Sequence, residues 1–213
     1  MASAAVKPLR ADAERNRRLL LDAAAEAFAE HGLDVSVDEI ARRAGVGHGT
    51  AFRRFPTKEH LVCAVVLDRM VEIAALAREL REAGGVADPV LEFMRRTIQL
   101  QVEDRALAES IGSGVLADPA IQVAHRELLR EIERLVTRAQ EAGQLRMDVS
   151  AVDVMVLTKG VAAASAPLQG AKPRIWRRYL DLVRDALRPE SAQPLDGRPP
   201  TLAQLERGLT ELH

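Results

Sequence analysis

Apolar residues recur every three or four positions along most of this 213-residue chain, which is the spacing of amphipathic helices. Residues 62–80 form one long apolar stripe, and two glycines at 84–85 end it. Asp-Pro pairs at 88–89 and 118–119 each place a capping acid before a proline, and an amphipathic pattern follows both. A shorter helix is expected at about 106–111. The pattern therefore predicts a succession of helices.

Residues 150–166 differ from these segments because they are apolar nearly all round. A helix without a polar face is expected to be covered on both sides. A last amphipathic helix is expected to end at about residue 188. Prolines then become frequent, which predicts a flexible tail over residues 189–213, with a short helix at 201–212.

Residues 36–54 have the layout of a helix-turn-helix. Ser36 and Glu39 have the spacing of a capping box, which satisfies free amides at a helix start. Gly45 supplies the permissive backbone that a tight turn between two helices needs. We therefore predict a short helix, a turn and a second short helix in this segment.

The second short helix carries side chains that can hydrogen-bond base edges and phosphates from the major groove. Arg53 and Arg54 are the most basic of these. The next helix starts after Pro56, where free amides and two neighbouring side chains are placed to hold a phosphate. The predicted DNA contacts are Ser36, Arg42, Gly47, His48, Gly49, Thr50, Phe52, Arg53, Arg54, Thr57 and Lys58.

Over residues 14–62 the chain resembles the TetR-type (TetR/AcrR) family of one-component transcriptional repressors. The matching motifs are LLDAAAEAFAEHG at 20–32, SVDEIA at 36–41, AGVGHGT at 44–50 and FRRFPTKEHL at 52–61. The family often has a larger aliphatic residue at the place of Ala51, and Tyr-Arg-His or Tyr-Tyr-His at the place of residues 52–54. At residues 52–54 this chain therefore lacks a phenol hydroxyl and has an extra guanidinium, so an operator sequence does not carry over from the family.

The resemblance implies an all-α protein in which an N-terminal three-helix helix-turn-helix domain precedes a larger helical domain for ligand binding and dimerisation. On this basis residues 1–13 are a flexible N-terminal arm, 14–58 the DNA-binding domain, 59–188 the effector-binding and dimerisation domain, and 189–213 a Pro-rich tail. The implied function is that of a ligand-released repressor bound to a palindromic DNA operator.

The resemblance also implies a largely apolar effector cavity in the body, and filling it rotates the two DNA-binding heads of a dimer apart. Thr97 and Gln101 add hydrogen-bonding groups to the helix face that carries Met94. Each candidate also has a plain interpretation as a core residue. The candidates for contact with an unknown small-molecule effector are Leu67, Met70, Phe93, Met94, Thr97, Gln101, Ile111 and Leu128.

A homodimer is expected because a single helix-turn-helix reads only a few base pairs, and two half-sites lie about one helical turn apart. The apolar helix at 150–166 and the last helix supply surface for a four-helix seam, and small residues allow close approach. The predicted interface residues are Met155, Gly160, Ala163, Ala164, Trp176, Leu180, Val183 and Leu187.

Composition agrees with a helical protein, since 47% of the residues are apolar but only 3% are aromatic. The net charge of −1 argues against a generic nucleic-acid coat, but residues 1–58 hold ten Lys and Arg against eight Asp and Glu.

The chain start lacks the apolar core of a secretion signal, and no apolar run approaches the roughly 18 residues of a spanning helix. One cysteine, Cys63, fits a reducing compartment. We therefore expect a cytoplasmic protein without a membrane partner.

Enzyme interpretations have little support in the sequence. The Gly-x-Gly-x-Gly run at 45–49 follows no strand pattern and lacks the Gly-Lys-Ser/Thr ending of a phosphate-binding loop. His60 and Cys63 have the spacing of a metal pair without an evident third ligand, and His125 is better explained as a core or polar-face residue than as a base. We expect no catalytic residue, cofactor or metal site. Two alternatives stay open, a constitutive helical DNA-binding protein without an effector and a helical enzyme.

Overall fold

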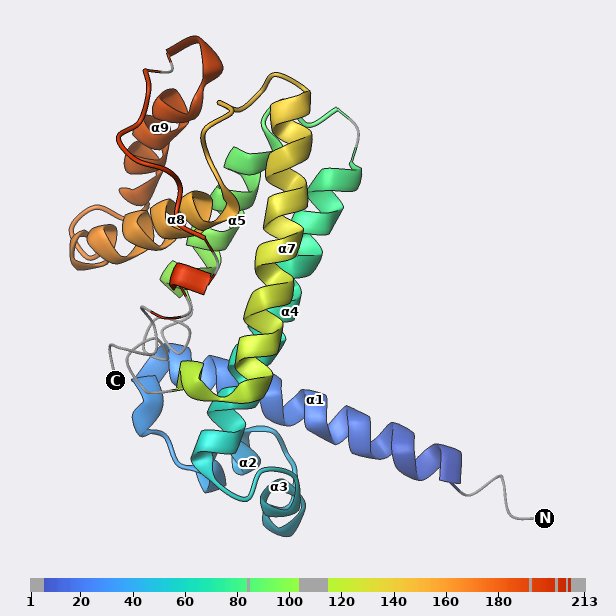
Figure 1. The fold of residues 1–213 in the computed structure, drawn as a ribbon. Coiled ribbons are helices and arrows are strands. Elements are labelled where there is room, and N and C mark those ends of the chain that lie inside the picture. The colour runs from blue at the N-terminus through green and yellow to red at the C-terminus, as the bar shows by residue number, and fades with distance from the viewer. Residues whose placement is uncertain are drawn as a thin grey trace. The chain divides into compact units, whose positions relative to one another are not determined.

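The computed structural model describes residues 6–83, 85–103, 115–191, 193–201, 203–205 and 207. Every regular element within these ranges is a helix, as the apolar pattern predicts (Figure 1). The chain forms two compact units, divided within helix α4 (Lys58–Glu82). The described residues up to Asp68 and those at 115–118 belong to the first unit, and the remainder belong to the second.

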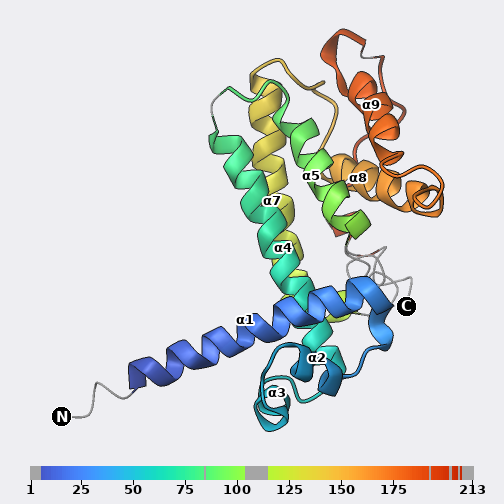
Figure 2. The ribbon, with the colours of Figure 1, turned by 180° about the vertical axis from the view of Figure 1, so that it is seen from behind.

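The first unit contains α1 (Val6–His31), the 3-10 turn η1 (Gly32–Asp34), α2 (Val37–Arg43), α3 (His48–Arg54), the start of α4 and the 3-10 turn η2 (Val115–Ala117) (Figure 2). Its core is apolar and fully enclosed, with Phe28, Ile40, Ala51 and Leu61 each 0% exposed. Helix α1 already begins at Val6, so most of the expected flexible arm at 1–13 is helical. Its Ala, Leu, Arg and Glu residues are strong helix formers, which explains the early start.

The second unit contains the rest of α4, α5 (Pro89–Glu103), α7 (Pro119–Glu141), α8 (Ala151–Ser165), α9 (Trp176–Leu187) and the 3-10 turns η3 (Ala166–Leu168) and η4 (Pro189–Ser191). Helix α5 packs against α7, α8 and α9 and thus lies at the centre of this unit. Phe93, Met94 and Ile98 of α5 are at most 1% exposed. The short helix expected at 106–111 lies outside the described residues.

Helix ends follow the capping chemistry of the sequence. The Leu91 backbone N–H donates to Asp88 Oδ1 at 3.0 Å, as expected for an acid before a helix-starting proline. Ser150 and Asp153 form a reciprocal capping box at the start of α8. Gly143, in the left-handed region at φ +68°, lies just after α7.

Helix α8 departs from the prediction that it is covered on both sides. Val156 is 51% exposed, and Gly160, Ala163 and Ala164 lie beside it in the exposed stripe. The opposite face, which includes Val154 and Thr158, is buried against α5, α7 and α9. Within the described chain, α5, α7 and α9 cover one side of α8, and a second side with small apolar residues stays exposed.

One helical segment is long and apolar enough to span a membrane by length and composition, although the sequence contains no uninterrupted apolar run of that length. Ala151–Leu168 has a mean hydropathy of 1.4 over 18 residues, although Asp153 and Lys159 interrupt it. This segment is 44% buried inside the protein, and the core helices of soluble proteins can be equally long and apolar.

Arg146, which the sequence analysis did not single out, fixes the end of α9. Its guanidinium donates to Asp148 Oδ1 at 2.6 Å and to the backbone oxygen of Ala186 at 3.1 Å. The backbone N–H of Arg146 donates to the backbone oxygen of Leu187 at 3.1 Å. The side chain is 7% exposed, so these bonds satisfy a buried charge.

The Glu92 carboxylate makes the folding stability of the second unit depend on pH in the acid range. Hydrogen bonds, chiefly from Arg95 and then from Arg96, lower the pKa of Glu92 from 4.5 to about 2 against the opposing effect of partial burial. The folded state therefore gains stability from this carboxylate above pH 4.5 and loses it as the pH falls towards about 2.

We expect Glu92→Gln to lower the free energy of unfolding at pH 7 by about 1–2 kcal/mol, a value reduced for solvent screening. Urea titrations should show this gap closing as the pH falls towards about 2, because the wild-type carboxylate is then protonated. Glu141→Gln on the exposed surface of α7 is the matched control and should change little at either pH. A gap that is independent of pH would contradict this explanation.

Candidate functional site

The helix-turn-helix forms as the sequence predicts, with one difference at its start. Ser36 caps α2 by accepting from the Glu39 backbone N–H at 3.2 Å. The Glu39 carboxylate accepts instead from Arg42 at 2.7 Å and from Arg43 at 3.1 Å, so only half of the predicted capping box is present. Gly45 has φ +64°, and this left-handed backbone makes the turn that glycine allows at low cost.

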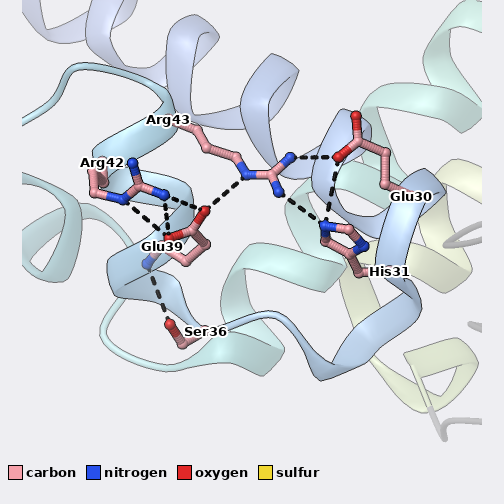
Figure 3. Close-up of polar contacts among 6 residues, drawn as sticks. All are labelled: Glu30, His31, Ser36, Glu39, Arg42 and Arg43. Atoms are coloured by element: carbon pink, nitrogen blue, oxygen red, sulfur yellow. Dashed lines mark hydrogen bonds and ion pairs between the residues drawn. The ribbon is translucent and has the colours of Figure 1, made fainter.

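An ionic cluster joins α2 to the end of α1 (Figure 3). Arg43 donates to Glu30 at 2.7 Å and lies 3.0 Å from His31 Nε2, in addition to its bond with Glu39. Hydrogen bonds from Arg42 first and Arg43 second lower the pKa of Glu39, and Arg43 likewise lowers the pKa of Glu30. Both arginines of α2 are therefore already paired with acids.

Helix α3 is held by Ala51, which is fully buried, while its two basic side chains remain exposed. Arg53 folds back along the helix and donates to Thr50 Oγ1 at 3.1 Å. A Cβ added at Gly49 would lie 3.4 Å from Arg53 Nη1, which is an ordinary van der Waals contact. Arg54 makes no polar contact with any other part of the described chain.

Helix α4 begins with a cap from Thr57. Its Oγ1 accepts from the His60 backbone N–H at 3.4 Å and lies 2.9 Å from His60 Nδ1. The neighbouring Lys58 is half-buried. Cys63 is half-buried as well, with its Sγ 4.0 Å from Asp118 Oδ2, and burial raises the pKa of its thiol.

The predicted DNA contacts thus lie on α2, α3 and the start of α4 within the first unit. Exposed among them are Ser36, Arg42, Gly47, His48, Gly49, Arg53, Arg54 and Thr57, and half-buried are Thr50, Phe52 and Lys58. Sequence reasoning missed Asp38, which bonds His48, because an acid in the first turn of a helix is explained by the helix dipole alone.

The effector candidates separate into core and partly exposed residues. Buried in the second unit are Met70, Phe93, Met94, Thr97 and Leu128, half-buried are Leu67 and Gln101, and Ile111 lies outside the described residues. Thr97 Oγ1 is enclosed and has no hydrogen-bond partner within the described part of the chain. Leu67 belongs to the first unit, whereas the other described candidates belong to the second.

Among the described residues of the second unit, one cleft of about 480 Å³ lies between α4 and α7 and another of about 540 Å³ lies between α4 and α5. Arginines and glutamates make up much of both linings, and none of the predicted effector residues lines either of them. These clefts therefore differ in chemistry from the apolar cavity that the resemblance implied.

The predicted interface residues also divide by burial. Met155, Trp176, Leu180 and Leu187 are at most 7% exposed because they pack into the second unit's own core. On the single chain these four side chains therefore leave little surface exposed. Gly160, Ala163 and Ala164 are exposed, and Val183 is half-buried.

Comparison with known proteins agrees with this arrangement. The sequence profile "Bacterial regulatory proteins, tetR family" matches residues 20–65, and the profile "Transcriptional regulator SbtR-like, C-terminal domain" matches residues 87–189. A TetR transcription regulatory protein from Mycobacterium vanbaalenii is 37% identical at a TM-score of 0.67, over 85% of this chain and 99% of its own. The chain belongs to the TetR family.

This TetR-family chain is thus a DNA-binding transcriptional regulator, and the family's regulators are not enzymes. The HTH-type transcriptional regulator UidR of Escherichia coli K12 is 24% identical over 73% of this chain and 84% of its own length. The SmeT–triclosan complex, whose protein comes from Stenotrophomonas maltophilia, shares the fold at 20% identity and a TM-score of 0.54, over 88% of this chain and 98% of its own.

Proposed function

We propose that this regulator is a ligand-released repressor, which binds a palindromic operator as a homodimer in the cytoplasm. The observation that carries the proposal is α3, a short exposed helix after a glycine turn with two arginines at its end. Such a helix enters the major groove, and a two-fold dimer places two of them one helical turn apart.

The residues proposed to face DNA have different roles. Arg54 is free to form a bidentate contact with a base or a phosphate, since no acid of the described chain holds it. Arg42 keeps its bond with Glu39 and is better suited to a phosphate than to a base. Thr57 and Lys58 at the start of α4 are proposed to hold a phosphate.

Lys58→Ala is expected to weaken binding to all duplexes similarly, because a phosphate contact carries no sequence information. The slope of log affinity against log salt should fall by roughly one counterion. Anisotropy titrations at several salt concentrations measure this slope, with Lys172→Ala on the exposed surface of the second unit as control. An unchanged slope would remove Lys58 from the proposed surface.

The dimer seam is proposed to use the open side of α8 and the exposed apolar side of α9. Val156 on α8 is 51% exposed, and Leu182 on α9 is 59% exposed. Exposed apolar side chains beside small residues allow two helices to approach closely and exclude water. The proposed seam residues are Val156, Gly160, Ala163, Ala164, Leu182 and Val183.

The effector is proposed to enter the second unit beside α5, among the buried apolar candidates. Thr97 supports this site because the residue is only 4% exposed and its hydroxyl has no hydrogen-bond partner within the described chain, and a ligand could supply one. Met94, Phe93 and Leu128 would give the ligand an apolar wall. The triclosan bound by SmeT is a precedent for a small organic effector in a protein of this fold.

Helix α4 is proposed to connect effector and DNA, because its residues belong to both units. A ligand that displaces Met70 or Ile73 would act on the helix that starts beside the DNA-binding surface. Ligand and operator must then weaken each other by the same factor, commonly about 5–150-fold.

Thr97→Val tests the effector site with two readouts. Valine has a similar shape and removes an unpartnered buried hydroxyl, so the free energy of unfolding should rise by about 1 kcal/mol. The response of operator affinity to ligand should weaken or disappear, while Thr97→Ser, which keeps the hydroxyl, should respond normally. A Thr97→Val protein with full ligand response would place the effector elsewhere.

The proposal of ligand release as a whole is tested by screening small molecules for stabilisation of the purified protein. Compounds that raise the melting temperature are then added to protein bound to a selected duplex. We expect at least one chemical class to stabilise the protein and to weaken DNA binding. Stabilising compounds that leave DNA affinity unchanged would favour a constitutive DNA-binding protein.

A further inference from the structure

Asp38 and His48 form a contact between the two helices of the helix-turn-helix. Asp38 lies in the first turn of α2 and His48 is the first residue of α3, and Asp38 Oδ1 is within short hydrogen-bond distance of His48 Nδ1. Both side chains are exposed, at 63% and 67% of their area. The pair therefore lies on the surface proposed to face DNA and is available to it.

A second contact restricts the imidazole further. The Phe52 ring lies 4.4 Å from the His48 ring, centroid to centroid, with 32° between their planes. Asp38 thus holds one ring nitrogen and Phe52 covers one ring face. The remaining nitrogen, Nε2, makes no polar contact with another described residue and is left at the free edge of the ring.

We propose that Asp38 is a positioning residue, which orients His48 so that Nε2–H donates to an acceptor on the duplex. The inference rests on the proposed DNA-binding surface and adds a residue that sets its specificity. A carboxylate that accepts from Nδ1–H fixes the ring orientation, and Nε2 carries the hydrogen that it donates when the imidazole is protonated on both nitrogens. The acceptor is a purine N7 or O6 in the major groove or a phosphate oxygen, and both accept the same N–H.

Charge explains why the ring donates in the complex. With a neutral imidazole the pair carries one negative charge at a polyanionic duplex, whereas with an imidazolium it carries none. DNA binding therefore favours the second proton on His48. Asp38 is the charged side chain that contacts the ring from α2, and Arg53, on the same helix as His48, is bonded to Thr50.

The alternative role for Asp38 is plain stabilisation of the N-terminus of α2, where acids are favourable. That role predicts a loss of stability on substitution and no change in which duplex is preferred. A carboxylate close to phosphates also repels DNA in general, so its removal without a positioning role would strengthen binding to every sequence alike. Only the positioning role therefore predicts weaker DNA binding through a lost contact, with lost discrimination where the acceptor is a base, whereas repulsion predicts stronger binding and stabilisation predicts an unchanged preference.

The test measures affinities of full-length wild type, Asp38→Ala, Asp38→Asn and His48→Gln for a selected duplex and for versions with single base pairs changed. We expect Asp38→Ala to lower discrimination at one base pair of each half-site by about tenfold. Asp38→Asn should restore most of it, because the amide oxygen still accepts from Nδ1–H. If the acceptor is a phosphate, the loss in Asp38→Ala is instead equal for all duplexes.

His48→Gln should lose discrimination at the same base pair as Asp38→Ala, because the ring that Asp38 orients is absent. Equal strengthening of all duplexes in Asp38→Ala, or discrimination and affinity that do not change in Asp38→Ala, would overturn the inference. Unchanged affinity in Arg53→Ala/Arg54→Ala would instead overturn the proposed DNA surface itself.

Discussion

Replacing Val156 and Leu182 together by aspartate is expected to give monomers and to reduce affinity for a palindromic duplex by more than about 100-fold. Both side chains are more than half exposed on the single chain, so the change should not disturb its own core. In the proposed dimer, four carboxylates would be placed in an apolar seam, where desolvation and repulsion oppose association. A monomer then reads one half-site only.

Sedimentation measures the association state of this variant, and anisotropy titration measures its DNA affinity. Val123→Asp is the matched control, because Val123 is 59% exposed on α7 and lies outside the proposed seam. The control should remain dimeric. Leu187→Asp would be a poorer test, since Leu187 is buried and its substitution would damage the fold. A dimer that survives the double change would place the interface on another surface.

The second large effect concerns α3. Arg53→Ala/Arg54→Ala should lower operator affinity by about 10- to 1,000-fold, since one good bidentate contact to a base contributes about 1–3 kcal/mol and two guanidinium groups are removed. Ala51, not the arginines, anchors α3 in the core, so circular dichroism should show unchanged helix content.

Arg130→Ala/Arg138→Ala is the control for this experiment. It removes the same charge from the exposed surface of α7 and should leave operator affinity nearly unchanged at fixed salt. If both double variants lose the same affinity, net charge explains the effect and α3 is not the reading helix. If neither loses affinity, the DNA surface lies elsewhere.

Local chemistry made the helices and their ends predictable. The apolar spacing of α5 and α7, the acid before Pro89 and the glycines at 45 and 143 each act within a few residues, so the sequence alone indicates them. The helix-turn-helix was predictable for the same reason, because its turn, cap and helix starts are all local.

Burial and pairing across helices were harder to predict. Trp176 and Leu180 are apolar residues on an amphipathic helix, and periodicity does not tell whether their stripe meets the chain's own core or a second chain. The Asp38–His48 contact joins residues ten positions apart on two helices, so it depends on how the helices cross. Arg146 likewise bonds to α9, some 40 residues away.

In the proposed complex, helix α3 of each subunit reads one copy of the same short sequence. Selection of bound duplexes from a random pool by the full-length wild-type protein reveals whether it does so. We predict enrichment of an inverted repeat whose half-sites lie about one helical turn apart, or a multiple of this spacing, and loss of this enrichment with Arg53→Ala/Arg54→Ala. Enrichment of no sequence, or of a single half-site without its inverted copy, would show that the protein does not bind a palindromic operator as a dimer.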